Sequence, residues 1–135
     1  MSDYNASIIE EFRTNEGTTE TYGDHLLLVH TTGHRTGAEH VHPVRTVVID
    51  GEWHIAGSAA GRAKDPVWAV NLRHHPDTVV EAPEGTVAVH AELLEGDARA
   101  TAWDAFTTVA PGFADYQEKA DAHGRTIPLF RLTRR

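Results

Sequence analysis

Hydrophobic side chains recur along the first part of the chain at helical spacing and then at strand spacing. The helical set predicts an amphipathic N-terminal helix within residues 1–17 and consists of Tyr4, Ile8 and Phe12. Four apolar residues in succession at 26–29 are typical of a buried strand. The β-branched run at 44–49 predicts another strand. Asp50-Gly51 predicts a tight hairpin after it, because both turn positions need a positive φ.

The second half of the chain predicts the remaining elements. A strand at 52–57 completes the first hairpin, and strands at 78–82 and 86–94 form a second one in which apolar and polar residues alternate. Asp65 and Asp97 each predict a helix start, because an aspartate at that position accepts hydrogen bonds from free backbone N–H groups. A last strand is predicted at 126–133, where Pro128 lacks an N–H and therefore indicates a sheet edge or a bulge.

This order of elements predicts the fold class. About six strands, joined mostly as hairpins, with about three short helices between them, predict an α+β protein built around an antiparallel β-barrel. We expect one domain over residues 1–135, with the helix of residues 1–17 packed on the barrel. A dinucleotide-binding fold of the Rossmann type is disfavoured because strands and helices do not alternate regularly.

Composition and charge exclude several classes of function. Twelve Lys and Arg against twenty Asp and Glu give a net charge of −8, which argues against a nucleic-acid partner. With no cysteine, the chain has no disulfide, thiol nucleophile or thiolate metal site. No apolar run approaches the roughly 20 residues of a membrane-spanning helix. The first residues lack the features of a secretory signal, so a cytoplasmic location is expected.

Two glycine-containing loops are candidate binding sites for an anionic cofactor. Residues 31–37 combine hydroxyls and two glycines with Arg35, a composition suited to phosphate. Residues 57–62 place small side chains at a strand end, where a backbone can approach a flat ring closely. Taken alone, the first loop is equally compatible with an ordinary surface turn, and the second is better explained as a tight strand-to-helix connection. The two together favour a shared anion site.

Other candidate residues carry weaker signals. Asn71 lies on the same predicted helical face as Trp68, where it can reach a ligand or loop backbone, or cap the following turn. His40 and His42 share a strand face, but no third ligand stands at a suitable spacing, so no metal site is expected. No triad of serine, histidine and aspartate and no nucleophile elbow is present, so the residues favour cofactor binding over side-chain hydrolysis.

A series of short motifs runs in order between Glu11 and Leu132. They are residues 27–37, Pro43, Gly57-Ser58, Asp65-Pro66 with Trp68, Asn71 and Leu72, Pro76, and Pro111-Gly112-Phe113 with Tyr116-Gln117. In this order and spacing they resemble the deazaflavin-dependent nitroreductase family, whose cofactor is coenzyme F-420. The resemblance implies a split β-barrel, and hydride transfer at C5 of the deazaflavin to quinones, nitro compounds or other activated acceptors.

The resemblance also implies roles for individual positions. Arg35, Thr36 and Gly37 correspond to residues that hold the phosphate or acidic tail of the cofactor, and Ser58, Ala59 and Ala60 to residues that lie along the deazaflavin. Further cofactor contacts correspond to His34, His42, Pro43, Arg62 and Asn71. Phe113 and Tyr116 correspond to the substrate-side aromatic cluster, in which the Tyr116 phenol is the one candidate catalytic proton donor.

Four positions depart from the family pattern. His34 and His40 stand where cations are usual, Ala59 where some members have lysine, and Phe113 where some have tyrosine. Fewer cations weaken binding of a polyanionic cofactor. A missing phenol makes nitro reduction less favoured than transfer to a small-molecule acceptor such as a quinone. We therefore predict a general deazaflavin-dependent reductase.

Three other hypotheses remain open on the sequence. A related barrel using FMN needs fewer cations, because FMN carries one phosphate and no glutamate tail. A non-catalytic carrier of the deazaflavin binds cofactor without turnover, and an interaction domain binds neither. A homodimer is also possible, through the exposed face of residues 87–93.

Overall fold

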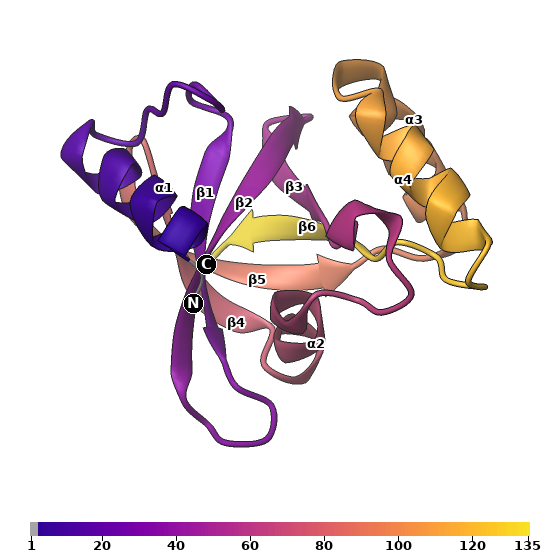
Figure 1. Cartoon of the computed structure of the whole chain (residues 1–135), viewed down its shortest axis with the longest axis horizontal. Coiled ribbons are helices and arrows are strands. Elements are labelled where there is room, and N and C mark those ends of the chain that lie inside the picture. The colour runs from indigo at the N-terminus through magenta and orange to yellow at the C-terminus, as the bar shows by residue number, and fades with distance from the viewer. Residues whose placement is uncertain (1–2) are drawn as a thin grey trace.

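Six strands form a closed antiparallel barrel in the computed structural model, which describes residues 3–135 (Figure 1). The order around the barrel is β1-β2-β3-β6-β5-β4, and β4 pairs with β1 to close it. The predicted α+β barrel is therefore confirmed. The strands are β1 (Leu26–Thr32), β2 (Glu39–Ile49), β3 (Glu52–Ala56), β4 (Asp77–Ala82), β5 (Gly85–Leu93) and β6 (Leu129–Arg134).

Within residues 3–135, four α-helices surround the barrel, one more than the three predicted. They are α1 (Asp3–Thr14), α2 (Val67–His74), α3 (Gly96–Val109) and α4 (Gly112–Asp121). A single turn of 3-10 helix, η1 (Ala59–Gly61), follows β3. The sequence missed α4 because Pro111-Gly112 resembles a stop signal. In the structure Pro111 precedes the first turn, where its missing N–H costs nothing.

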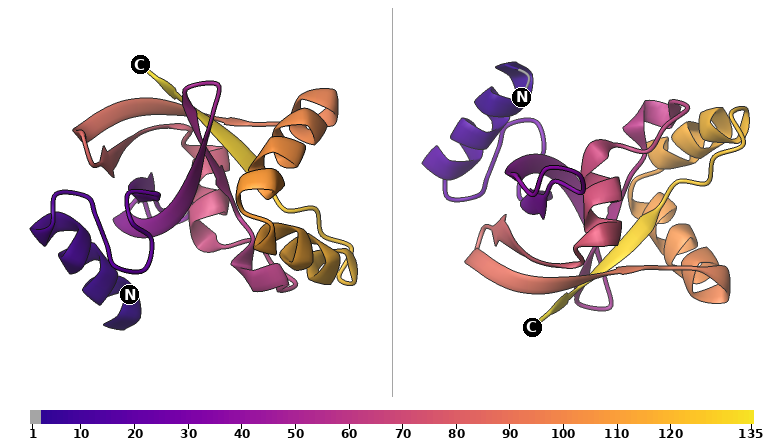
Figure 2. Two further views of the ribbon diagram at one scale, coloured as in Figure 1. Left: turned by 90° about the horizontal axis from the view of Figure 1, so that it is seen from above. Right: turned by 90° about the horizontal axis from the view of Figure 1, so that it is seen from below.

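The helices lie on different sides of the barrel. Figure 2 shows α1 on one side, α3 and α4 together on the opposite side, and α2 between them. α1 packs through Ile8, Ile9 and Phe12 on Leu26 and Leu28 of β1. No helix among residues 3–135 is long and apolar enough to cross a membrane.

Strand β1 is buried on both of its faces, which explains its four successive apolar residues. Leu27 and Val29 point into the barrel, where they pack with residues such as Ile55 and Phe130. The alternate residues Leu26 and Leu28 are covered by α1. Each leucine of this run is no more than 1% exposed. The packing of α1 therefore depends on the outward face of β1.

The predicted hairpin turn is present in the structure, whereas the two predicted helix caps are not. Asp50 and Gly51 adopt φ values of 53° and 78° and connect β2 to β3, which confirms the predicted hairpin. The predicted caps at Asp65 and Asp97 are wrong. Pro66 and Glu95 occupy the cap positions, and neither cap makes a side-chain hydrogen bond.

The predicted placement of Pro128 inside the last strand is also wrong. β6 begins one residue later, at Leu129, so the missing N–H of Pro128 removes no ladder hydrogen bond. The Pro128 carbonyl instead accepts the Gly57 N–H at 2.8 Å.

A cluster of charged groups ties α1 to the barrel. The Glu81 carboxylate accepts hydrogen bonds from Arg13 Nε at 3.0 Å and Arg13 Nη2 at 2.7 Å. His30 Nε2 lies 2.8 Å from the same carboxylate. The hydrogen bonds from Arg13, followed by the one from His30, lower the pKa of Glu81 below its usual value despite partial burial. The end of α1 is thereby fixed against β4.

Glu81→Gln is expected to lower the free energy of unfolding by about 1 kcal/mol at neutral pH, since Arg13 is half exposed and solvent screens the pair. Because the pKa of Glu81 is lowered on folding, its contribution is present above the ordinary value of 4.5 and is lost as the pH falls through the lowered one. Urea unfolding at pH 7 and pH 3 tests this. An equal difference between wild type and variant at both pH values would contradict the ionic explanation.

Candidate functional site

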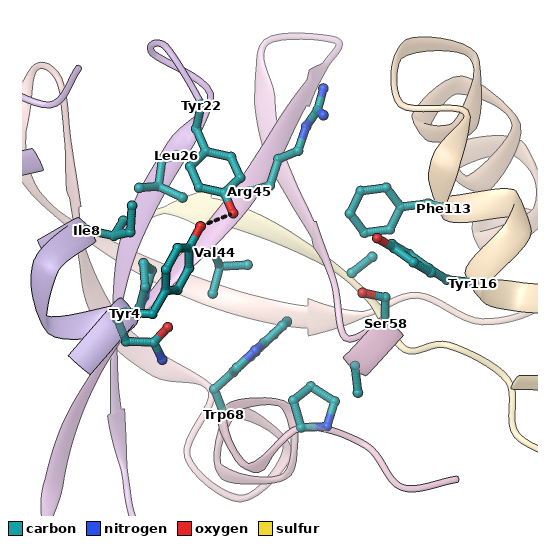
Figure 3. A pocket seen from close by; sticks show the side chains of 15 residues that line it. Tyr4, Ile8, Tyr22, Leu26, Val44, Arg45, Ser58, Trp68, Phe113 and Tyr116 are labelled. Carbon is teal, nitrogen blue, oxygen red and sulfur yellow. Dashed lines mark hydrogen bonds between the residues drawn. The ribbon is translucent and has the colours of Figure 1, made fainter. Parts of the chain in front are cut away.

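A cleft of about 340 Å³ opens on the outside of the barrel between α1 and α4 (Figure 3). Its walls come from α1 and the turn after it on one side and from α4 on the other. β2, the end of β3 and the start of α2 lie between them. Prominent lining residues are Tyr4, Tyr22, Pro43, Arg45, Ser58, Ala59, Trp68, Phe113 and Tyr116. The site is therefore assembled from segments far apart in the sequence.

The loop of residues 57–62 forms one side of this cleft in an unusual conformation. Ala59 and Ala60 have φ values of 46° and 54°, in the left-handed region that residues with a Cβ rarely adopt. Two successive residues of this kind store conformational strain of order 1 kcal/mol or more each. Such strain persists only where neighbouring groups hold the loop, and it is characteristic of binding sites.

The Arg125 side chain holds this loop. Its guanidinium donates to the carbonyls of Gly57 at 3.0 Å, Ser58 at 2.5 Å and Arg62 at 2.9 Å. It also pairs with the Asp65 carboxylate at 2.7 Å. The Arg125 side chain is only 9% exposed. One buried cation thus satisfies three loop carbonyls and fixes the two ends of the segment relative to each other.

The same loop packs directly on α4. Gly61 has a φ of +76°, and a Cβ at this position would lie 2.5 Å from Lys119 Cβ and 2.7 Å from the Tyr116 carbonyl oxygen. Only glycine allows this approach. The loop therefore sets the position of α4 and, with it, the Tyr116 side chain in the cleft.

A series of aromatic rings orients Phe113 and Tyr116. Phe113 meets Phe106 edge to face at 4.9 Å between ring centres, and Tyr116 meets Phe113 in the same way at 5.5 Å. Phe106 is completely buried. Edge-to-face pairs of this kind fix ring orientation. Figure 3 shows the Tyr116 hydroxyl directed toward the middle of the cleft.

A second network joins the loop of residues 33–37 to α2. The Asn71 Oδ1 accepts the backbone N–H of His34 at 3.1 Å and lies 2.8 Å from His34 Nδ1. The Asn71 amide donates to the Thr31 hydroxyl at 3.1 Å, and that hydroxyl lies 3.1 Å from His42 Nε2. Burial, with the neighbouring His40 as a lesser cause, lowers the pKa of His42 to about 4. His42 is therefore neutral at pH 7, and its Nε2 shares a hydrogen bond with the Thr31 hydroxyl.

The structure brings together only part of the predicted site. Five of the predicted residues line the cleft: Pro43, Ser58, Ala59, Phe113 and Tyr116. Asn71 is fully buried, and its side chain accepts the His34 backbone N–H. Of its three predicted alternatives, the structure thus contains the contact with loop backbone. The remaining predicted cofactor residues lie outside the cleft lining, and they are His34, Arg35, Thr36, Gly37, His42, Ala60 and Arg62.

Sequence reasoning missed several residues of the site. Tyr4 and Tyr22 carry hydroxyls 3.2 Å apart at the α1 wall, and no local pattern distinguishes them from ordinary helix and turn residues. Arg45 interrupts the β-branched run of β2, which is a signal that could have been used. Arg125 follows α4 in a polar segment, and its side chain lies 60 or more residues from each of the groups that it binds.

The charges around the site suit an anionic ligand. No Asp or Glu lines the cleft among the described residues. Arg35 is exposed on the 33–37 loop and has no ion-pair partner within residues 3–135. No group of three or more His, Asp or Glu that could hold a metal ion occurs in the described part of the chain. The donor set is suited to an organic anion.

Arg125→Gln is expected to lower the free energy of unfolding by about 3 kcal/mol, because it leaves three carbonyls and a carboxylate without their buried donor. Amide hydrogen exchange of residues 58–62 should accelerate with it. Arg73→Gln is the matched control, since Arg73 makes a longer, more exposed pair with the same Asp65 at 3.3 Å. Equal losses in the two variants would refute the special role of Arg125.

His42 predicts a pH dependence of stability. With a folded pKa of about 4 against 6.5 unfolded, the folded state binds fewer protons between these values, so stability falls as the pH drops from 6.5 toward 4. Between pH 7 and pH 5, the free energy of unfolding should fall by about 1 kcal/mol less in His42→Asn than in wild type, allowing for the partial exposure of His42. Urea unfolding measures this, with the exposed His25→Asn as control. If the free energy of unfolding changes with pH equally in wild type and His42→Asn, His42 is not a source of the pH dependence.

Comparison with known proteins places this geometry in a family. The model of the F-420H(2)-dependent quinone reductase family matches residues 4–134. A candidate F-420H(2)-dependent quinone reductase of Mycobacterium tuberculosis is 28% identical over 107 residues, which cover 79% of this chain and 87% of that protein.

Solved structures agree with this match. An F-420H(2)-dependent reductase has a TM-score of 0.69 at 29% identity, covering 80% of this chain and 93% of its own. A protein described as a domain-swapped dimer has a TM-score of 0.72 at 26% identity, covering 97% and 99%. The haem storage protein HutZ of Vibrio cholerae, 17% identical with a TM-score of 0.55, shares the fold alone. Because the family model spans nearly every residue, the chain belongs to the F-420H(2)-dependent quinone reductase family.

Proposed function

We propose that this F-420-dependent oxidoreductase binds the deazaflavin ring in the cleft between α1 and α4 and reduces a quinone there. The observation that carries the proposal is the strained loop of residues 57–62, held by Arg125 beside the flat Trp68 side chain and the Tyr116 phenol. A rigid wall with small side chains permits close contact with a planar ring.

The size of the cleft supports this assignment. About 340 Å³ lies near the lower end of the range of roughly 300–1,000 Å³ for small-molecule sites, which suits a ring system without its tail. The acidic tail is then held outside the cleft, and the 33–37 loop with the unpaired Arg35 is the predicted partner. The network from His34 through Asn71 keeps that loop against α2.

Hydride transfer from F-420 to a quinone requires only one proton from a side chain. Reduced F-420 supplies a hydride, that is two electrons and a proton, at C5. A quinone that takes up this hydride needs one further proton to become a hydroquinone. Tyr116 is the proposed donor, since its hydroxyl faces the cleft and its ring is fixed by Phe113. Phe113 itself offers no proton, which favours quinones over acceptors that need more acid assistance.

FMN and a purely carrier role are the competing possibilities. FMN has no glutamate tail, so its binding depends less on Arg35. A carrier binds deazaflavin but oxidises none of it when a quinone is added. A cytoplasmic location and a homodimer stay predictions, and the similarity to a domain-swapped dimer supports the second.

Titration with oxidised F-420 and with FMN, followed by the fluorescence of Trp53, Trp68 and Trp103, tests the proposal. We expect micromolar binding of F-420, weaker binding of FMN, and quinone-dependent oxidation of reduced F-420. Arg35→Ala should weaken F-420 binding roughly 10-fold or more by removing a charge-assisted contact. The same substitution should not change the affinity for a truncated deazaflavin that lacks the phosphate and the glutamates. Preference for FMN, or binding without turnover, would overturn the proposal.

A further inference from the structure

Arg45 is the one charged side chain among the described residues that line the cleft. It lies on the outward face of β2, opposite Leu26 of β1, and its side chain rises between Tyr22 and Phe113 in the view of Figure 3. Its Nε is buried and has no hydrogen-bond partner. No carboxylate within residues 3–135 forms an ion pair with it.

Nε itself is closed off from the cleft, but the two terminal nitrogens of the Arg45 guanidinium are not, and they also have no hydrogen-bond partner within residues 3–135. An anionic oxygen in the cleft is the group that best satisfies them. The rest of the lining offers no competing anion, because no Asp or Glu contributes to it among the described residues. A protein with a net charge of −8 thus presents a locally positive cleft. This contrast favours entry of a negatively charged ligand.

The position of Arg45 separates it from the expected binding region of the cofactor tail. Arg45 lies six residues into β2 from Glu39, and at roughly 3.3 Å per residue this places it about 20 Å from the start of the strand. The 33–37 loop with Arg35 is at that start. A ring bound beside Ser58 with its tail at Arg35 therefore leaves Arg45 for the acceptor.

Two phenols line the same cleft as Arg45, on the α1 wall. The hydroxyls of Tyr22 and Tyr4 lie 3.2 Å apart, and both residues line the cleft. The hydrogen bond to Tyr4, with burial as a further cause, raises the pKa of Tyr22, so this phenol keeps its proton at neutral pH. The cleft therefore presents hydrogen-bond donors on the α1 wall and a cation on β2, a combination that suits a ligand whose oxygen atoms share a negative charge.

We propose that Arg45, with the Tyr22–Tyr4 pair, forms an acceptor subsite that selects quinones carrying an anionic oxygen, such as an ionised ring hydroxyl. This proposal depends on the proposed function in one respect only, namely that the acceptor is a quinone. It adds a charge preference that the cofactor site does not require.

Equilibrium dialysis of the cofactor-free protein against two naphthoquinones tests the subsite. One quinone carries two methyl groups on the quinone ring. In the other a hydroxyl, ionised at neutral pH, replaces one methyl. Wild type should bind the anionic quinone roughly 10-fold or more tightly than the neutral one, the effect of one charge-assisted hydrogen bond. Arg45→Gln should remove this preference while the affinity for the neutral quinone stays within about twofold.

Two further variants control the measurement. Lys64→Gln removes the same charge from an exposed position outside the cleft lining and should keep the full preference. Arg45→Lys keeps the charge and should restore part of the preference. Thermal melts followed by circular dichroism establish that each variant is folded.

The outcomes separate this subsite from the function on which it builds. A preference that survives in Arg45→Gln, or is lacking in wild type, would overturn the subsite even if F-420 binds normally. Failure to bind F-420 with the charge preference intact would count against the proposed function and leave the assignment of Arg45 standing.

Discussion

Closure of a six-stranded barrel is the constraint from which the position of the site follows. A barrel of this size has no interior room for a ligand, because inward side chains such as Leu27, Ile55 and Phe130 fill it. Any small molecule must therefore bind on the outside. The outer surface is covered by α1 on one side and by α3 and α4 on the other, and the cleft is the interval between these covers.

The helices on the two sides of the cleft are connected to the residues that line it. Gly61 seats the 57–62 loop against α4, and Arg125, which follows α4, binds the carbonyls of that same loop. α4 thus supplies the Tyr116 phenol and, through the segment after it, the cation that holds the loop. On the opposite side, the pair of Arg13 and Glu81 fixes the helix that carries Tyr4. Both walls are positioned by charged contacts rather than by apolar packing alone.

The sequence predicted what depends on neighbouring residues. The hairpin at Asp50-Gly51 follows from the backbone conformation of two positions, and the run at 26–29 follows from burial on both faces of one strand. The small-residue loop at 57–62 was also visible, since its composition shows that backbone can approach a ligand.

What the sequence did not predict depends on contacts between distant segments. Asp65 resembles a helix cap, but its carboxylate pairs with Arg125, whose own surroundings give no sign of this role. α4 was missed because Pro111-Gly112 is read equally well as an end or as a beginning, and only packing of Phe113 on Phe106 decides between them. Tyr4 and Tyr22 meet because α1 and the turn after it fold over β1, which no short pattern encodes.

Charge placement explains how an acidic protein can serve an anionic cofactor. The eight excess negative charges are distributed over the surface, whereas the lining of the cleft has no carboxylate among the described residues. Repulsion from the surface is screened within about 8–10 Å at physiological ionic strength, while groups inside a cleft act at shorter range and with less screening. The net charge is therefore compatible with the two proposals, in which Arg35 holds the cofactor tail and Arg45 holds an anionic acceptor at the other end of the site.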